Sequence, residues 1–403
     1  MSIHVVGLGL DPDALPEPHM HAIDQAHILV GGKRQLALFD DHPAEKIVID
    51  KHLEAVFAAM GERDNDDTEI VVLADGDPLF YGIGKRLIDA FGPEALYILP
   101  NVTTLQAAAA KIKIPWDGVA TVSLHGRNDF QPLYAALTAN DWVAVLTDRK
   151  NIPSAIAGAL MEKGAERYVK MWVFEDMETE DERVERYALA EAAQKSFSHL
   201  NLVLLERRGG PEKTLCLGMA CDDYAHHGVI TKWPVRAAGL AALRLRPDNV
   251  VWDLGAGCGS VALEATALAH RGRVVAVEKN ADRVADIREN IRRFGALSVD
   301  VVHGAMPGCL AELPDPDRIF IGGGLQKNNE VLREACRRLR PKGRLVIACV
   351  LFNSLMRTKE YLQTLDWPFA ITLVQAGQSS TLASDLHLEG NNPVFILSAE
   401  KSV

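Results

Sequence analysis

The fold of the second half of this chain is decided by the stretch Val250-Val251-Trp252-Asp253-Leu254-Gly255-Ala256-Gly257-Cys258-Gly259. A mostly apolar run that suits a buried strand leads into three glycines at alternate positions, and a helical pattern over 261–269 follows, with Ser260 as its expected N-cap. Glycines permit a tight turn and let a ligand approach the backbone at a helix N-terminus. Glu278 ends the next predicted strand, where an acid can accept hydrogen bonds from both ribose hydroxyls. The pattern therefore predicts a site for a nucleoside-containing ligand.

Further strands around this motif indicate an α/β sheet. After 250–254 they are predicted at 273–278, 299–302, 318–321, 344–348, 370–375 and 394–398. The last two are joined by 377–393, which is rich in Ser, Gly and Asn, and no helix of normal length is predicted between them. An antiparallel pair that closes an otherwise parallel, seven-stranded sheet is the simplest topology.

The glycine turn leaves two cofactor classes open. A dinucleotide site has a similar turn, but its pyrophosphate fingerprint places the third small residue one position later, at Ser260. The Gly-Ala-Gly-Cys-Gly form and the antiparallel end of the sheet resemble class I S-adenosylmethionine-dependent methyltransferases, with a Rossmann-like sheet. This resemblance favours methyl transfer over hydride transfer.

The first half of the chain is predicted to be a separate α/β unit. Its strands are expected at 3–6, 28–30, 46–49, 69–73, 96–99, 120–124, 142–146, 168–174 and 202–205. Pro115-Trp116-Asp117-Gly118 interrupts the pattern, and the polar stretch from Arg207 to Lys213 contains Gly and Pro. We therefore expect a first domain at 1–208, with lobes 1–116 and 117–208, a linker at 209–215 and a second domain at 216–403.

Three strand-to-helix corners stand out in this first half. They are Val5 to Pro12, Ala74-Asp75-Gly76-Asp77-Pro78, and Pro100-Asn101-Val102-Thr103-Thr104, where a Thr is the expected N-cap. Each alone is an ordinary turn pattern. In this order they resemble the class III tetrapyrrole methylases over roughly residues 1–205. The resemblance implies S-adenosylmethionine contacts at Asp75, Gly76, Asp77, Thr103 and Thr104.

A fourth segment, Ser123-Leu124-His125-Gly126-Arg127, resembles the branch of that family that acts at C5. Arg127 is a candidate for bidentate binding of a propionate or acetate of the substrate, and a surface ion pair is the alternative. His125 is a weaker candidate for catalysis, since a strand-end His is commonly a turn residue.

The second half also resembles a particular family. His227-Gly228-Val229-Ile230-Thr231-Lys232, Val235-Arg236 and Ile321-Gly322-Gly323-Gly324, together with the glycine turn, resemble the cobalt-precorrin C15-methyltransferase (decarboxylating) family over roughly 216–403. The implied S-adenosylmethionine contacts are Thr231, Gly255, Gly257, Gly259, Glu278 and Ala305. Lys232 and Arg236 are candidates for binding an anionic substrate, against the alternative of solvated surface residues.

The two resemblances together match a fusion, the precorrin-6Y C5,15-methyltransferase (decarboxylating) family of cobalamin biosynthesis. This implies two S-adenosylmethionine sites and an anionic tetrapyrrole substrate, precorrin-6Y/6B, that is methylated at C5 and C15 and loses CO2 from its ring-C acetate to give precorrin-8. The transferred methyl is already activated, and orientation supplies up to about 7–11 kcal/mol. No catalytic base is therefore assigned.

Composition limits the remaining classes. The 403 residues are 48% hydrophobic and 24% charged, with a net charge of −11, which argues against a nucleic-acid partner. An RNA methyltransferase remains the main alternative, and a tetrapyrrole carrier without transfer activity is a second. The six cysteines show no C-x-x-C spacing, so no metal site is expected. No membrane-spanning run or signal peptide is recognised, so a cytoplasmic enzyme is expected, and the resemblances imply a homo-oligomer.

Overall fold

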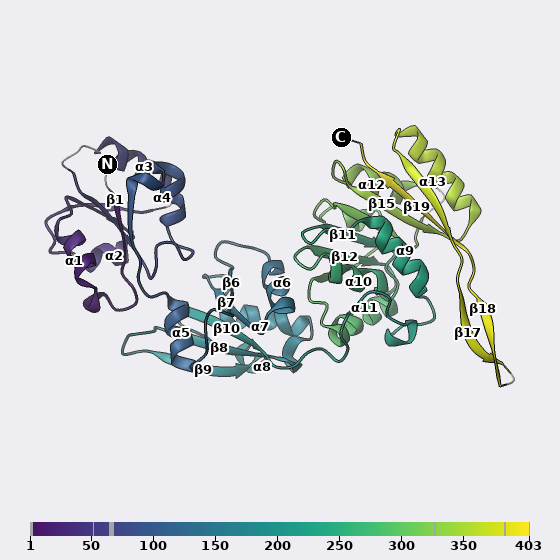
Figure 1. The fold of residues 1–403 in the computed structure, drawn as a ribbon, viewed down its shortest axis with the longest axis horizontal. Helices are drawn as coiled ribbons and strands as arrows, with labels where there is room; N and C mark the ends of the chain where they lie inside the picture. The colour runs from purple at the N-terminus through teal and green to yellow at the C-terminus, as the bar shows by residue number, and fades with distance from the viewer. Residues whose placement is uncertain (1–2, 51, 64–67, 326–327, 383, 403) are drawn as a thin grey trace.

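The computed structural model describes residues 3–50, 52–63, 68–325, 328–382 and 384–402. Three bodies, each built around its own sheet, follow one another along the chain and lie in a row (Figure 1). The described helices include none that is both long and apolar enough to cross a bilayer.

The first body is a five-stranded parallel sheet in the order β3-β2-β4-β1-β5. Buried apolar residues cover both faces, as expected for a parallel sheet between helices. Its strands are β1 (Ile3–Gly7), β2 (Ile28–Gly31), β3 (Glu45–Val48), β4 (Ile70–Ala74) and β5 (Leu96–Leu99), and its helices are α1 (Glu17–Asp24), α2 (Lys33–Ala37), α3 (Leu53–Glu62) and α4 (Gly84–Phe91).

The second body is a mixed sheet in the order β6-β7-β10-β8-β9, in which only β6 and β7 are parallel. Its strands are β6 (Ala120–Ser123), β7 (Trp142–Leu146), β8 (Val169–Glu175), β9 (Arg183–Ala188) and β10 (Asn201–Arg207), and its helices are α5 (Thr104–Ile112), α6 (Gln131–Ala139), α7 (Pro153–Glu162) and α8 (Leu189–Ala192). Strand β9 was not predicted, because it is a mostly exposed edge strand with charged residues and no apolar alternation.

The third body is a seven-stranded sheet in the order β13-β12-β11-β14-β15-β19-β16. Strands β11 to β15 are parallel, and β19 runs antiparallel between β15 and β16. The strands are β11 (Val250–Leu254), β12 (Arg273–Glu278), β13 (Val299–His303), β14 (Arg318–Ile321), β15 (Arg344–Cys349), β16 (Phe369–Val374) and β19 (Val394–Glu400), and the helices are α9 (Trp233–Leu243), α10 (Ser260–Leu268), α11 (Ala281–Phe294), α12 (Glu330–Arg338) and α13 (Phe352–Thr364). The predicted Rossmann-like class with an antiparallel end is confirmed.

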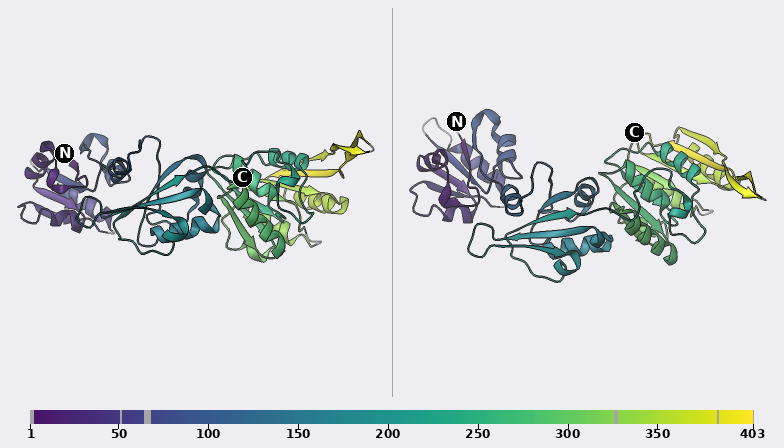
Figure 2. Two further views of the ribbon diagram at one scale, coloured as in Figure 1. Left: turned by 90° about the horizontal axis from the view of Figure 1, so that it is seen from below. Right: turned by 60° about the horizontal axis from the view of Figure 1, so that its bottom comes forward.

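The connection between the last two strands differs from the prediction. No strand was predicted within it, but β17 (Gly377–Leu382) and β18 (Asp385–Gly390) form an antiparallel hairpin that projects from the third body (Figures 1 and 2). Polar and small residues hid the strand pattern, because the pairing is between backbones and buries little apolar surface. Leu386 and Leu388 remain 73% and 76% exposed.

Candidate active sites

The glycine turn of the second half has the conformation that only glycine adopts readily. Gly255, Gly257 and Gly259 have φ values of +73°, +59° and +81°. A Cβ on Gly255 would stand 2.6 Å from the carbonyl oxygen of Gly323, so the glycine run after β14 packs against the turn. Gly259 is the N-cap of α10, and Ser260 is therefore the first helical residue instead of the predicted cap.

Glu278 lies at the centre of this turn. Its side chain is buried at the end of β12, and its Oε2 accepts a hydrogen bond from the Gly257 N–H at 3.0 Å. Its Oε1 accepts from the backbone N–H groups of Lys279 and Asn280 at 2.9 and 3.0 Å. The structure thus brings together the acid and the glycines that the sequence singled out about 20 residues apart.

Ala305 and Thr231 lie on two further segments near the turn. The Gly304 N–H donates to the Glu278 carbonyl at 3.0 Å, which places the exposed Ala305 beside the acid. Val229 lies over the turn from the other side, since its carbonyl oxygen is 3.5 Å from the position of a Cβ on Gly257. Thr231 follows two residues later on the same segment.

Asp253 is a residue of this site that the sequence argument quoted but gave no role. It is buried in β11, and its Oδ2 accepts from the Ala262 N–H in the first turn of α10 at 3.0 Å. Burial raises the pKa of the Asp253 carboxyl to about 7, and the charge of Glu278 adds to the shift. A carboxyl group that titrates near neutral pH therefore lies directly beneath the glycine turn.

Arg236 was predicted to bind substrate, and the structure contradicts this. Its side chain is fully buried, and its Nε donates to Oε1 of the fully buried Glu264 at 2.7 Å. A charge sealed in this way cannot meet a ligand at the surface. The signal for this outcome is the i, i+3/i+4 apolar spacing of α9, which places Arg236 on the same face as Leu240 and Leu243.

The buried pair instead organises the segment that covers the glycine turn. Arg236 Nη1 donates to the Thr231 carbonyl at 2.6 Å, and Nη2 donates to the Met219 carbonyl. Glu264 accepts from the backbone N–H groups of Gly218 and Met219 and from the Tyr224 hydroxyl, each at 3.0 Å. Lys232, by contrast, is exposed at the N-cap of α9, where a ligand can reach it.

Asn290 also fixes this segment, although no sequence pattern marked it. It is fully buried on α11, and its Nδ2 donates to the carbonyls of Cys258 and Ala225, each at 2.9 Å. One side chain thereby holds the glycine turn and its cover to the same helix. A lone Asn inside a charged amphipathic helix gives no signal of such a role in sequence.

In the first half, the predicted corners meet at one place. The Gly76 N–H donates to the Gly9 carbonyl at 3.2 Å, and Asn101 Nδ2 donates to the Gly7 carbonyl at 2.9 Å. A Cβ on Gly7 would stand 2.4 Å from the Gly76 carbonyl oxygen, so the corners touch through bare backbone. Gly76 itself has φ +57°.

These corners line two neighbouring cavities of about 340 and 370 Å3. The second body closes the first of these cavities with residues at one end of its sheet: Leu146, Thr147, Phe174 and Asn201. Asp75, Gly76 and Thr104 line both cavities, and Asp77 and Thr103 line the second. The five residues that the resemblance singled out therefore lie around one hollow between the first two bodies.

The polar side chains here mostly shape the backbone. Asp77 Oδ1 accepts from the Leu79 N–H at 2.7 Å, and Thr103 forms the predicted N-cap of α5 as part of a capping box with Gln106. Asp75 pairs with Arg34 at 2.8 Å on the exposed rim. These contacts fix the shape of the corners around the hollow.

His125 and Arg127 lie on an exposed loop after β6, at the same end of the second sheet as this hollow. Asp148 accepts from the Gly126 N–H at 2.7 Å, and Asn151 donates to the carbonyls of Leu124 and Arg127 at 2.7 and 2.9 Å. The backbone hydrogen bonds from Asn151 and Gly126 lower the pKa of Asp148 to about 2. The loop backbone is held firmly while both candidate side chains face solvent.

Comparison with known proteins matches the two halves of the chain to two different methyltransferase families. Residues 2–193 match the family model of tetrapyrrole (corrin/porphyrin) methylases, and residues 222–395 match a precorrin methyltransferase domain. A precorrin-6Y C(5,15)-methyltransferase [decarboxylating] of a Sinorhizobium species is 31% identical over 86% of this chain and 84% of its own length.

Relatives of the separate halves are also found. A cobalt-precorrin-7 C(5)-methyltransferase of Salmonella typhimurium is 34% identical over 51% of this chain and 98% of its own. A probable cobalt-precorrin-6B C(15)-methyltransferase (decarboxylating) of Pyrobaculum calidifontis is 34% identical over 42% of this chain and 88% of its own. Fold and sites thus define a fusion of two methyltransferase units. The chain belongs to the precorrin-6Y C5,15-methyltransferase (decarboxylating) family.

The role of the buried pair can be tested by Arg236→Met. We expect the free energy of unfolding of the second half to fall by about 3–5 kcal/mol, because Glu264 would keep a buried charge without its partner. Binding of S-adenosylmethionine should weaken as well, since the Thr231 segment loses its donor. Urea unfolding and calorimetry measure the two effects. Lys232→Met, at the exposed neighbouring position, is the control, and equal stability of both variants would contradict the assignment.

Asp253 predicts a pH dependence. Its folded pKa of about 7 lies above the usual aspartate value of 3.8, so the folded state holds a proton that the unfolded state releases. This stabilising contribution is complete below the unfolded pKa and is lost as pH rises towards 7. Relative to Asp253→Asn, the wild-type unfolding free energy should fall between pH 4 and 7 by up to about 1.4 kcal/mol per pH unit. Parallel curves in denaturant titrations would rule this out.

Proposed function

We propose that this chain methylates a reduced tetrapyrrole of the precorrin-6Y/6B type at C5 with its first half and at C15 with its second. The second half also removes CO2 from the ring-C acetate, so that precorrin-8 results. The observation that carries this proposal is the presence of two separate backbone-lined sites on one chain whose relatives carry both activities in their names.

Each site fits S-adenosylmethionine. In the second half, the glycines of the turn let a ligand approach the backbone closely at the N-terminus of α10, whose dipole favours a carboxylate, and Glu278 stands where ribose hydroxyls can bind. In the first half, the hollow beside Gly76 and Thr104 offers bare backbone in the same way. When bound, the cofactor supplies a methyl group activated by its sulfonium. The protein therefore needs no covalent nucleophile of its own.

The chain contributes positioning and charge. A macrocycle with many carboxylates is repelled by a protein of net charge −11 unless basic side chains stand at the mouths of its sites. Arg127 in the first half and Lys232 in the second are exposed and suitably placed, whereas Arg236 acts inside the fold. We assign no general base, and His125 keeps only the weaker role of a candidate at the first mouth.

The assembly of the chain and its surroundings are part of this proposal. We infer a homo-oligomer in the cytoplasm that binds neither nucleic acid nor membrane. The exposed leucines of the β17–β18 hairpin, Leu386 and Leu388, support association between copies, because apolar side chains on a projecting hairpin gain from being covered.

Mass spectrometry of the product tests the function directly. The purified chain, given precorrin-6Y and S-adenosylmethionine, should yield a product with two added methyl groups and one CO2 lost. Transfer of labelled methyl to total RNA, with none to the tetrapyrrole, would establish the alternative RNA methyltransferase. Binding of the tetrapyrrole without any transfer would establish a carrier.

Charge reversal at Arg127 tests the division of labour. Arg127→Glu should lower kcat/KM for methylation at C5 by about 10- to 100-fold, because a charge-assisted hydrogen bond is worth about 1.5–3 kcal/mol. Methylation at C15 should be unchanged. Arg86→Glu, an exposed position of the first body that lines a different cavity, is the matched control. Equal loss at both carbons would refute the assignment.

A further inference from the structure

The two sites lie on opposite sides of the junction between the second and third bodies, and strand β10 shows this for the first half. Asn201, at its beginning, lines the cofactor hollow, together with Leu146 of the neighbouring strand β7. Arg207, at its other end, lines a different cavity at the junction with the third body. Seven residues of strand span about 20 Å. The second sheet thus keeps the first site away from the junction by its full length.

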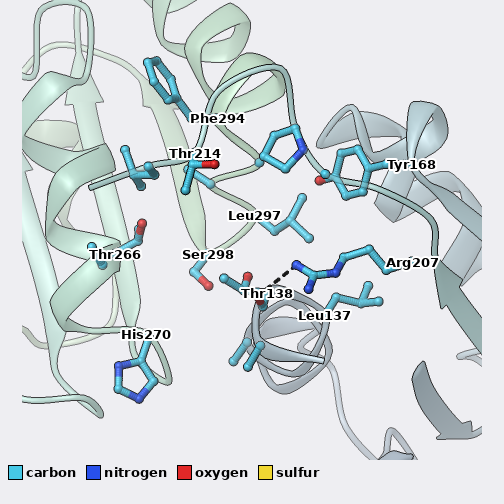
Figure 3. Close-up of a pocket in the computed structure, with 18 of the residues that line it drawn as sticks. Leu137, Thr138, Tyr168, Arg207, Thr214, Thr266, His270, Phe294, Leu297 and Ser298 are labelled. Atoms are coloured by element: carbon cyan, nitrogen blue, oxygen red, sulfur yellow. Dashed lines mark hydrogen bonds between the residues drawn. The ribbon is translucent and has the colours of Figure 1, made fainter. Parts of the chain in front are cut away.

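The junction cavity has a volume of about 610 Å3 and is walled by both halves (Figure 3). Thr138, Tyr168 and Arg207 come from the second body, and Thr266 and His270 come from the third. An internal hydrogen bond from Arg207 to the Thr138 carbonyl spans part of it. The cavity belongs to the contact between the halves, because both halves line it and its lining includes none of the residues assigned to the cofactor sites.

The third body meets the second with the edge opposite to its own site. Helix α10 begins at the glycine turn with Ser260 and ends beside the junction cavity near Thr266. Strand β12 likewise begins with Arg273, which pairs with Asp129 of the second body at 2.8 Å, and ends with Glu278 in the turn. Helix α10 and strand β12 therefore both run between the cofactor turn and the junction with the second body. The cofactor site of the third body thus faces away from the second body, and the two halves are joined back to back.

Buried and charged contacts make this junction firm. Leu297, just before β13, belongs to the apolar core of the second body and is only 1% exposed. Asp300 pairs with Lys163 at 2.9 Å and with Arg273 at 3.0 Å, and Gln131 Nε2 donates to it at 3.2 Å. Swinging the sites towards each other would expose Leu297 and break this cluster.

From this geometry we propose that the once-modified macrocycle leaves the molecule before its second modification and enters the other site from solution. This inference rests on the proposed function. A linked pair of sites gains from a high effective concentration only when the geometry lets both act on one ligand, and the back-to-back junction prevents that. The fusion therefore does not channel its intermediate within one chain.

Two variants with one inactivated half each provide the test. Thr104→Trp fills the hollow of the first half, and Gly257→Val blocks the turn of the second, where φ is +59°. Each variant must retain the transfer of its intact half, which shows that the chain is folded. A chain that carries both substitutions is the negative control.

The mixture of the two single variants is compared with the wild type at equal concentration of each active site. The mixture should form the final product at a rate within about twofold of the wild-type rate. Transfer of the intermediate within one chain would instead make the wild type faster than the mixture by about 10²-fold at low protein concentration. A second measurement uses labelled starting tetrapyrrole and a pool of unlabelled intermediate from the variant that accepts the starting compound. The final product should carry the diluted label of the pool. Undiluted label, or a wild type that far outpaces the mixture, would overturn the proposal. A wild type that adds no methyl to the tetrapyrrole would instead refute the function itself.

Discussion

Close approach of bare backbone at the carboxyl ends of parallel strands is the constraint on which both sites depend. In one half, Gly7 and Gly76 come so near that a Cβ would stand 2.4 Å from a carbonyl oxygen, and in the other Gly255 and Gly323 leave only 2.6 Å. No side chain can occupy these places, so a ligand can approach the backbone closely there. The two different sheets thus share one feature: close contact between backbone segments at the ends of their parallel strands.

The glycine turn of the second half is covered by segment 218–231, and a buried ion pair holds this segment in place. Arg236 and Glu264 cost desolvation energy, which their mutual contact and their hydrogen bonds to segment 218–231 offset. A purely apolar pair would fill the same space but could not bind that many backbone groups. The buried pair therefore specifies the position of a segment whose regular structure is limited to one 3-10 turn, Cys221–Asp223.

Much of this was predictable from sequence, for a physical reason. Several strands of the parallel sheets are short, apolar and followed by glycine, and the helix predicted at 261–269 lies within a residue of α10 (Ser260–Leu268). Hydrophobic periodicity indicates which face of a helix or strand is buried, so it predicts elements that bury an apolar face. It failed at β9 and at the β17–β18 hairpin, where little apolar surface is buried.

Site residues were harder to predict, because a sequence shows which groups are present but not what they pair with. Gly257 and Glu278 are spaced as a turn and its acid require, and they meet. Arg236 looked like its exposed neighbour Lys232, and only its helical phase distinguished the two. Asn290 acts over 32 residues to hold Cys258, a distance at which local pattern carries no information.

The junction suggests what the fusion provides if it does not channel. Leu297 of the second half completes the core of the second body, so that body has a full core only when the second half is docked. A buried leucine of this kind stabilises by about 1.5–3 kcal/mol relative to an exposed one, a large share of the stability of an ordinary domain. Contact through Leu297 thereby contributes to the stability of the second body, and one chain carries the two catalysts in equal numbers. Mutual support of this kind requires only a tight contact between the backs of the halves, and it leaves both mouths free for a large anionic substrate.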